Sequence, residues 1–402
     1  MGPKLPIIRR ARKTSPERPK ALFRGVPILN MASNQAAPSS HLPALDGLRG
    51  FAALWVLVGH VFQQTALGSP ILWLPLHNGY AVDLFMMLSG YLMFRLYGAS
   101  ADSKPAAFWL RRWFRLTPLY FTCLLLAFLT ASSFLVARKA IFEFSQFNFA
   151  TWPIRSDWPS ALAHVTFAFG LIPSLSQSTA MPDWSLSLEM QFYLLFPALV
   201  ALFKRVGAGL ATVVLAATQL LLLLLFQSYF REFTFPSPLP LELNLFLSGM
   251  AIAIPGRRQI LVGVLLATMT SSSPSAAAVR AVLALLLATG ARAAFHPVLL
   301  PLASLVRRPF EVPLARWLGS ISYPIYLTHL TVLFFALSAL LNLGLHEKRL
   351  LAAITLAITL AVTLSISQLL HWLIELPGIN FGRRAVARVS GRMRESGPGL
   401  SR

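Results

Sequence analysis

Charge, acidic residues and cysteine are all scarce in this 402-residue chain. Only 12% of its residues are charged, against about 25% in soluble globular proteins, while 56% are hydrophobic. The single Cys123 excludes a disulfide within one chain and a zinc site built on several thiolates. It lies in an apolar run, where a thiol behaves as a small hydrophobic side chain. These shortages exclude an ordinary soluble domain and predict a polytopic membrane protein.

The chain contains 14 acidic residues and 35 Lys and Arg residues, which gives a formal net charge of +21. A basic surface of that size would suggest nucleic-acid binding in a soluble protein. Here the basic residues cluster in short segments between apolar runs, so the positive-inside rule explains them more simply. We expect lipid around the bundle and no nucleic-acid partner.

Residues 1–41 are polar, rich in Pro and basic, with almost no acids. This composition predicts a disordered cytoplasmic tail, because it cannot bury a core. The segment also loosely resembles an organelle transit peptide, although its prolines oppose the required amphipathic helix. Met31 is an alternative translation start. We predict one membrane domain over 42–380 and a basic cytoplasmic tail over 381–402.

Ten apolar runs approach the ~20 residues that a membrane helix needs. Connections rich in Lys and Arg alternate with connections that contain few of them. This pattern predicts an all-α bundle of about ten spans with both termini cytoplasmic. A further apolar stretch, 160–171, is too short to span and is interpreted as re-entrant or interfacial. The ten runs cover 48–67, 76–97, 116–137, 184–203, 207–228, 240–256, 259–271, 279–299, 317–342 and 350–374.

The first run carries Arg49 near its start and His60 eleven residues later. At 1.5 Å per residue they lie about 16 Å apart along the helix, one at the mouth and one near the membrane midplane. The predicted topology also brings Asp83, Glu189 and His329 between the midplane and the outer face. Ionisable side chains at that depth are costly and mark functional sites.

This separation suggests a two-ended chemistry. Arg49, Arg111, Arg112 and Arg115 at the inner mouth could hold phosphates, whereas His60 could take a proton from a hydroxyl. A long phosphopantetheine arm has the right shape to connect the two ends. On the simpler interpretation the arginines only set topology and His60 only hydrogen-bonds a neighbouring helix. Zinc is disfavoured, because no two of the histidines and acids share a helix at ligand spacing.

Several motifs carry a family resemblance. The chain resembles the acyltransferase 3 family of integral-membrane O-acyltransferases, known from the modification of bacterial surface polysaccharides. The matching segments run in order from residue 45 to 377: LDGLRGFAALWVLVGH over 45–60, VDLFMMLSGYL over 82–92, RRWFRLTPLY over 111–120, WSLSLEMQFY over 184–193, GSISYPIYLTH over 319–329 and ELP over 375–377.

The resemblance implies transfer of an acyl group, usually acetyl, from cytoplasmic acyl-CoA to a hydroxyl of a glycan or lipid-linked acceptor at the bacterial inner membrane. No bound cofactor is expected, since acyl-CoA is a co-substrate. His60 would be the base or acyl relay, with Arg49 as its essential partner and Glu189 or Asp83 orienting its imidazole. The implied positions divide into a catalytic set, Arg49, His60 and Glu189, and a substrate-binding set, Asp83, Arg112, Arg115, Tyr193, Tyr323 and His329.

Two other function classes remain open on the sequence. A multispan transporter also places polar residues near the midplane, although no inverted repeat is visible. A catalytically silent acyl-CoA or lipid sensor would keep the same fold. Neither the acceptor nor the oligomeric state follows from the sequence.

Overall fold

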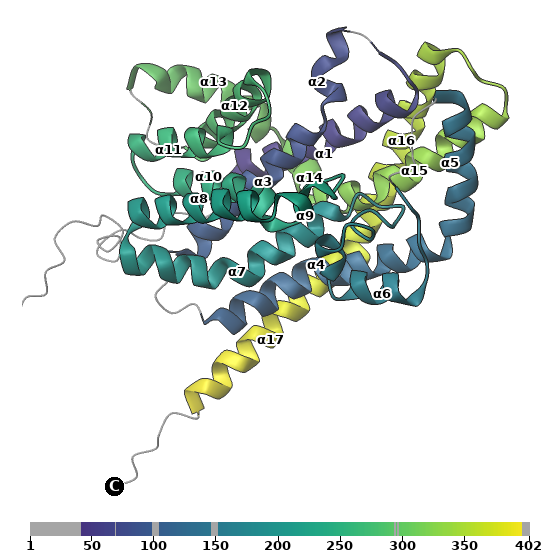
Figure 1. The fold of residues 1–402 in the computed structure, drawn as a ribbon. Coiled ribbons are helices and arrows are strands. Elements are labelled where there is room, and N and C mark those ends of the chain that lie inside the picture. The colour runs from purple at the N-terminus through teal and green to yellow at the C-terminus, as the bar shows by residue number, and fades with distance from the viewer. Residues whose placement is uncertain are drawn as a thin grey trace, which may run out of the picture. The chain divides into compact units, whose positions relative to one another are not determined.

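The computed structural model describes residues 42–395 except 69, 99–103, 146–151, 293–294 and 296. The expected tail 1–41 and Met31 lie outside these residues. Within the described part the regular elements are helices, with no strand, so the all-α membrane bundle is confirmed (Figure 1). The α-helices are α1 (Pro43–Gln64), α2 (Trp73–Leu76), α3 (Gly79–Met93), α4 (Pro105–Leu129), α5 (Ala131–Ser145), α6 (Trp158–Val165), α7 (Trp184–Val206), α8 (Ala208–Leu225), α9 (Gln227–Arg231), α10 (Leu239–Ala253), α11 (Arg257–Thr268), α12 (Pro274–Gly290), α13 (Leu300–Glu311), α14 (Pro313–Ser320), α15 (Ser322–Asn342), α16 (Lys348–Leu370) and α17 (Leu376–Glu395).

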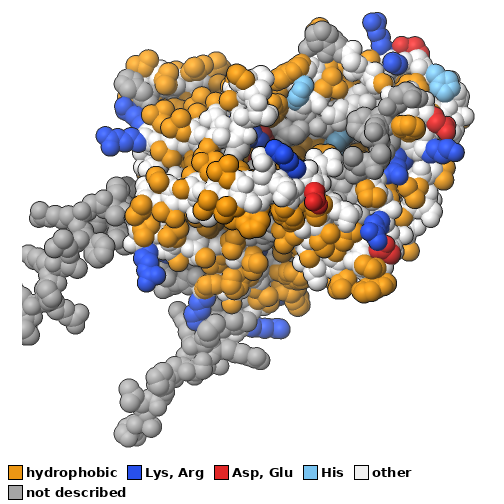
Figure 2. Space-filling view, viewed as in Figure 1, with side chains coloured by type: hydrophobic (Ala, Val, Ile, Leu, Met, Phe, Trp, Pro, Cys, Tyr) orange, Lys and Arg blue, Asp and Glu red, His pale blue; other side chains and the backbone are white. Residues whose placement is uncertain are grey.

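Five helical segments of the described chain are long and apolar enough to cross a membrane. They are α1, α7, α8, α15 and the continuous α16–α17 segment, and the bent pair α4–α5 could form a sixth. Two shorter apolar helices, α10 and α12, fall below this length. Hydrophobic side chains occupy broad areas of the face shown in Figure 2, as expected for a surface in contact with lipid. Ten spans and cytoplasmic termini stay predictions.

The boundaries predicted for the third run, 116–137, are wrong. The helix begins at Pro105, a residue suited to a first helical turn, and it breaks at Thr130, where α5 turns away from α4 by 71°. The basic segment before 116, which was placed in a connection, therefore forms the first turns of α4. Similarly, the expected run 317–342 is divided between α14 and α15.

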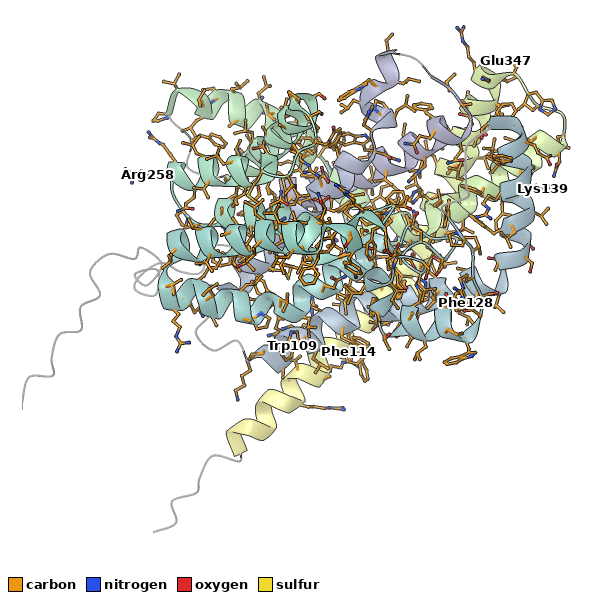
Figure 3. The ribbon with its side chains drawn as sticks, viewed as in Figure 1. Trp109, Phe114, Phe128, Lys139, Arg258 and Glu347 are labelled. Atoms are coloured by element: carbon orange, nitrogen blue, oxygen red, sulfur yellow. The ribbon has the colours of Figure 1, made fainter. Side chains whose placement is uncertain are left out.

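The C-terminal segment also differs from a plain tail, because α17 continues to Glu395. It packs along α4, as Figure 1 shows. A Cβ added to Gly378 would lie 2.9 Å from the carbonyl oxygen of Phe114, so glycine permits the close approach. The centre of the Phe114 ring, labelled in Figure 3, lies 4.9 Å from that of Phe381, with the ring planes 57° apart.

Acidic side chains cap the N-termini of α6 and α16. The Asp157 carboxylate accepts from the Ser160 N–H at the start of α6, and Glu347 accepts from two N–H groups at the start of α16. These backbone donors hold the pKa of both carboxyls below the ordinary value. The interfacial segment expected over 160–171 consists of α6 and one 3₁₀ turn, Ala168–Leu171, each too short to span.

Helices α3 and α10 cross closely because glycines meet at the crossing. A Cβ on Gly90 would lie 2.1 Å from the Phe246 carbonyl oxygen, and one on Gly249 would lie 1.9 Å from that of Met87. Small residues that let backbones approach are typical of membrane helix pairs. This crossing fixes the position of α3 beside the cavities described below.

A buried ion cluster joins α12 to the same pair of helices. The Arg280 Nε donates to Asp83 Oδ2 at 2.8 Å, and its Nη2 lies 3.4 Å from the Glu242 carboxylate. Its Nη1 donates to the Thr270 hydroxyl at 3.1 Å. Each of these three side chains is at most 12% exposed. The guanidinium thus binds the carboxyl groups of two helices at once.

We expect Arg280→Met to destabilise the fold by about 3–5 kcal/mol, because it leaves Asp83 and Glu242 buried without a counter-charge. Thermal unfolding in detergent measures the loss. Arg258→Met is the matched control, since Arg258 is exposed at the margin of Figure 3. Equal unfolding temperatures for the two variants would contradict the assignment.

Candidate functional site

Two cavities lie next to each other in the bundle and share one lining residue, Tyr326. The first, called the arginine cavity, holds about 800 Å³ between the protein atoms, and the second, the histidine cavity, about 1130 Å³. Both volumes include space open to the exterior. Polar residues of the arginine cavity are Arg49, Ser89, Arg112, Arg115, Ser185, Glu189, Tyr193, Ser322 and Tyr323.

Helices α1 and α4 supply the cations of the arginine cavity. The Arg112 Nη2 donates to the Tyr97 hydroxyl at 3.1 Å, and its guanidinium lies 5.9 Å from the centre of the Tyr193 ring. The Arg115 Nη1 is paired with the buried Glu375 carboxylate. Both side chains are therefore held in place before any ligand arrives, which lowers the entropy cost of binding an anion.

Glu375 lies at the end of a π-helical turn, His371–Glu375, that connects α16 to α17. Its second oxygen is 2.6 Å from His371 Nδ1, so the carboxylate bridges an imidazole and a guanidinium. The sequence pattern ELP pointed to this position without giving it a role. Such π turns occur often at functional sites.

Glu189 enters the arginine cavity from α7 with its charge already satisfied. The Ser89 hydroxyl donates to Oε1 at 2.9 Å, and the Tyr193 hydroxyl donates to the same oxygen. The expectation that Glu189 or Asp83 orients His60 therefore differs from the observed contacts. Glu189 is bound by two hydroxyls, and Asp83 is bound by Arg280 and lines neither cavity.

His60 and His329 stack within the bundle, with ring centroids 5.4 Å apart and ring planes 28° apart. The Ile325 carbonyl can only accept, so His329 Nδ1 carries the proton of their 3.0 Å hydrogen bond and Nε2 is left as an acceptor. That Nε2 and His60 Nδ1 are buried without a partner among the described residues. His60 lines the histidine cavity, whereas Arg49 lines the other one.

Tyr326 stands between the two groups. Its hydroxyl is 2.6 Å from Ser185 Oγ, and its ring lies 6.1 Å from His329 and 6.0 Å from Phe85. The sequence motif contained Tyr326, but it was not chosen as a site residue. Its position three residues before His329, hence on the same helix face, was the available signal.

The structure thus brings six of the nine expected residues into the arginine cavity. His60 lines the neighbouring cavity, His329 stacks on it and Asp83 lies apart. Arg280 was missed, although a lone arginine in an apolar run is a signal of a buried partner. In the part of the chain that the structure describes, no group of three His, Cys, Asp or Glu side chains could hold a metal ion. The six are Arg49, Arg112, Arg115, Glu189, Tyr193 and Tyr323.

Comparison with known proteins finds several relatives, among them an acyltransferase and an O-acetyltransferase. Acyltransferase MdmB of Streptomyces mycarofaciens is 29% identical over 189 residues, which cover 43% of this chain and 45% of MdmB. O-acetyltransferase OatA of Staphylococcus aureus is 30% identical over 168 residues, which cover 40% of this chain and 25% of OatA. The chain therefore aligns with less than half the length of these relatives. No solved structure matches the chain.

A family model described as an acyltransferase domain matches residues 42–372, which is well over half of the chain. This range includes every residue that lines the two cavities, and Glu375, the counter-ion of Arg115, lies just beyond it. The resemblance of the motifs is thereby confirmed. On the strength of this match, the chain belongs to the acyltransferase 3 family.

Proposed function

We propose that the chain is an integral-membrane O-acyltransferase that moves an acyl group, acetyl first among them, from cytoplasmic acyl-CoA to a hydroxyl of a glycan or lipid-linked carbohydrate. Family membership supports acyl transfer, and the similarity to the O-acetyltransferase OatA supports acetyl as the group transferred. The observation that carries the proposal is the shared wall at Tyr326 between the cationic cavity and the histidine cavity.

The donor would bind in the arginine cavity. Acyl-CoA carries phosphates at one end and a thioester at the end of a thin arm. Arg49 and Arg112, with Arg115 held by Glu375, would neutralise the phosphates. The arm would then extend between Ser185 and Tyr326 toward the histidines. No metal or other cofactor is required for this step.

The acceptor hydroxyl would bind in the histidine cavity beside His60. His60 would take the hydroxyl proton while the oxygen attacks the thioester carbon. The C–S bond then breaks, and the proton passes from His60 to the departing sulfur. An ester and free CoA are the products. His329, stacked on His60, would hold the first ring in position.

The distribution of basic residues supports a membrane side for the donor. Because Arg112 and Arg115 of the basic first half of α4 line the arginine cavity, we propose that this cavity faces the cytoplasmic side of a bacterial inner membrane. The acceptor would then enter from the opposite half of the bundle. This arrangement lets the donor and acceptor approach without sharing an entrance.

We expect His60→Gln to lower acetyl transfer by about 10²-fold or more, because it removes the base, while acetyl-CoA still binds. Free CoA release by protein reconstituted in lipid nanodiscs, with labelled acetyl-CoA and a glycan acceptor mixture, measures transfer. His346→Gln is the control, since that histidine is exposed and far from either lining. Full transfer by His60→Gln would overturn the base assignment. Saturable binding without turnover in the wild type would instead support a sensor.

We expect Arg112→Met to weaken acetyl-CoA binding about tenfold or more, because a charged hydrogen bond to phosphate is worth about 1.5–3 kcal/mol. Binding of acetyl-pantetheine, which lacks the nucleotide, should not change. Arg111→Met is the matched control, because Arg111 precedes it on α4 but does not line the cavity. If both donors lose affinity equally in Arg112→Met, the guanidinium does not recognise the nucleotide end.

A further inference from the structure

The histidine cavity differs from its neighbour in having no fixed charge. None of its described lining residues is Asp, Glu, Lys or Arg, whereas the arginine cavity has three arginines and a glutamate. Among the described residues that line the histidine cavity, the titratable groups are the His60 imidazole and the Tyr326 hydroxyl. A charged ligand group buried here would lack a counter-ion, which costs several kcal/mol.

Aromatic rings form part of this cavity. Trp184 and Phe235 lie with ring centroids 5.4 Å apart and planes at 32°. Trp152 is fixed by its Nε1, which donates to the Thr179 carbonyl at 2.9 Å. The ring of Tyr326 closes the side toward the arginine cavity. Rigid aromatic faces of this kind pack against the apolar C–H face of a ring at little entropy cost.

Four carboxamides and the Thr234 hydroxyl group supply the remaining polarity. Gln63 Nε2 donates to the Leu76 carbonyl at 2.7 Å, and Asn78 Nδ2 donates to that of Val56 at 3.4 Å, so both side chains are held by backbone. Gln64 and Gln177 differ, since the Oε1 of each is buried without a partner among the described residues. An orphan acceptor costs about 1–3 kcal/mol until a donor reaches it.

Those two orphan atoms are acceptors, so they select ligands that donate hydrogen bonds. Hydroxyl groups donate and also accept, which suits carboxamides. Carboxylates and phosphates only accept, and they would leave both oxygens unsatisfied. The lining therefore favours hydroxyls and disfavours anions by two independent effects, hydrogen bonding and charge burial.

We propose that the histidine cavity binds an uncharged, polyhydroxylated ring, a neutral sugar without carboxylate, phosphate or ammonium groups. Its apolar face would lie on Trp184 and its hydroxyls would donate to Gln64 and Gln177. This inference rests on the proposed function for the role of that ring as the acyl acceptor. Acceptor selectivity would then arise from binding in the histidine cavity, whose lining disfavours charged sugars, and not from the chemical step of acyl transfer.

The test is equilibrium binding by titration calorimetry to the full chain in lipid nanodiscs at about pH 7.5, without acyl-CoA. The probes are methyl glycosides of glucose, galactose, mannose and rhamnose, compared with methyl glucuronide, methyl galacturonide and glucose 6-phosphate. At least one neutral glycoside should bind tenfold or more tightly than every anionic probe. Trp184→Leu should weaken its binding about threefold to tenfold, through the lost ring contact.

A charge variant tests the selection directly. Gln177→Lys places a cation in the cavity, so it should raise the affinity for a uronide relative to the neutral sugar at least tenfold. Gln177→Met, of similar size and uncharged, should weaken neutral binding without any gain for the uronide. Anionic probes that bind the wild type as tightly as neutral ones would overturn the proposal, as would no neutral binding up to about 10 mM.

The two proposals fail separately in this design. Neutral binding that is retained while no acetyl is transferred would reject the acyltransferase and keep the sugar site. Transfer to anionic acceptors would reject the neutral-sugar site and keep the acyltransferase.

Discussion

Burial of charge at low dielectric constant is the constraint on which this bundle depends. Several ionisable side chains in the described interior have a specific counter-charge or donor. Arg280 joins Asp83 and Glu242, Arg115 joins Glu375, and Glu189 receives two hydroxyl donors. These contacts connect separate helices: α12 with α3 and α10, α4 with the π turn before α17, and α7 with α3. The polar contacts therefore specify which helices are neighbours, a task that apolar packing against lipid-like surfaces leaves open.

The same constraint separates the two cavities. Cations held by Tyr97 and Glu375 line one of them, while the other offers aromatic rings, carboxamides and the His60 imidazole. A donor with phosphates and an acceptor without charge would each meet the surface that suits it. Tyr326, with its hydroxyl on Ser185, is the boundary across which a reacting group would pass. Separation of the two ligands by chemistry also limits entry of the donor's nucleotide into the acceptor side.

The sequence carried the class of fold and most of the site, and the reasons for success and failure are physical. Apolar runs with few charges report a membrane bundle directly, and the motif residues Arg49, Arg112, Arg115 and Glu189 did meet in one cavity. The break at Thr130 was missed because an apolar composition continues across it, so hydropathy has no signal for a 71° turn. The partner of Asp83 was missed for another reason. The position of a residue along a helix gives its depth in the membrane, but it does not say which neighbouring helix the side chain faces. Asp83 and His60 could share a depth and still face different neighbours.

The π turn at His371–Glu375 determines how α17 is rotated about its axis relative to α16. An α-helix advances the azimuth by about 100° per residue, and the wider π turn takes up one extra residue without that advance. Winding the same residues as a regular α-helix would therefore rotate all of α17 by about that angle, and Glu375 and the glycine that meets Phe114 could not then both keep their places. The π turn thus lets α16 and α17 each keep its own packing partners. Loss of one residue with a return to regular winding would leave α17 in phase, so this turn should tolerate a deletion better than a second insertion.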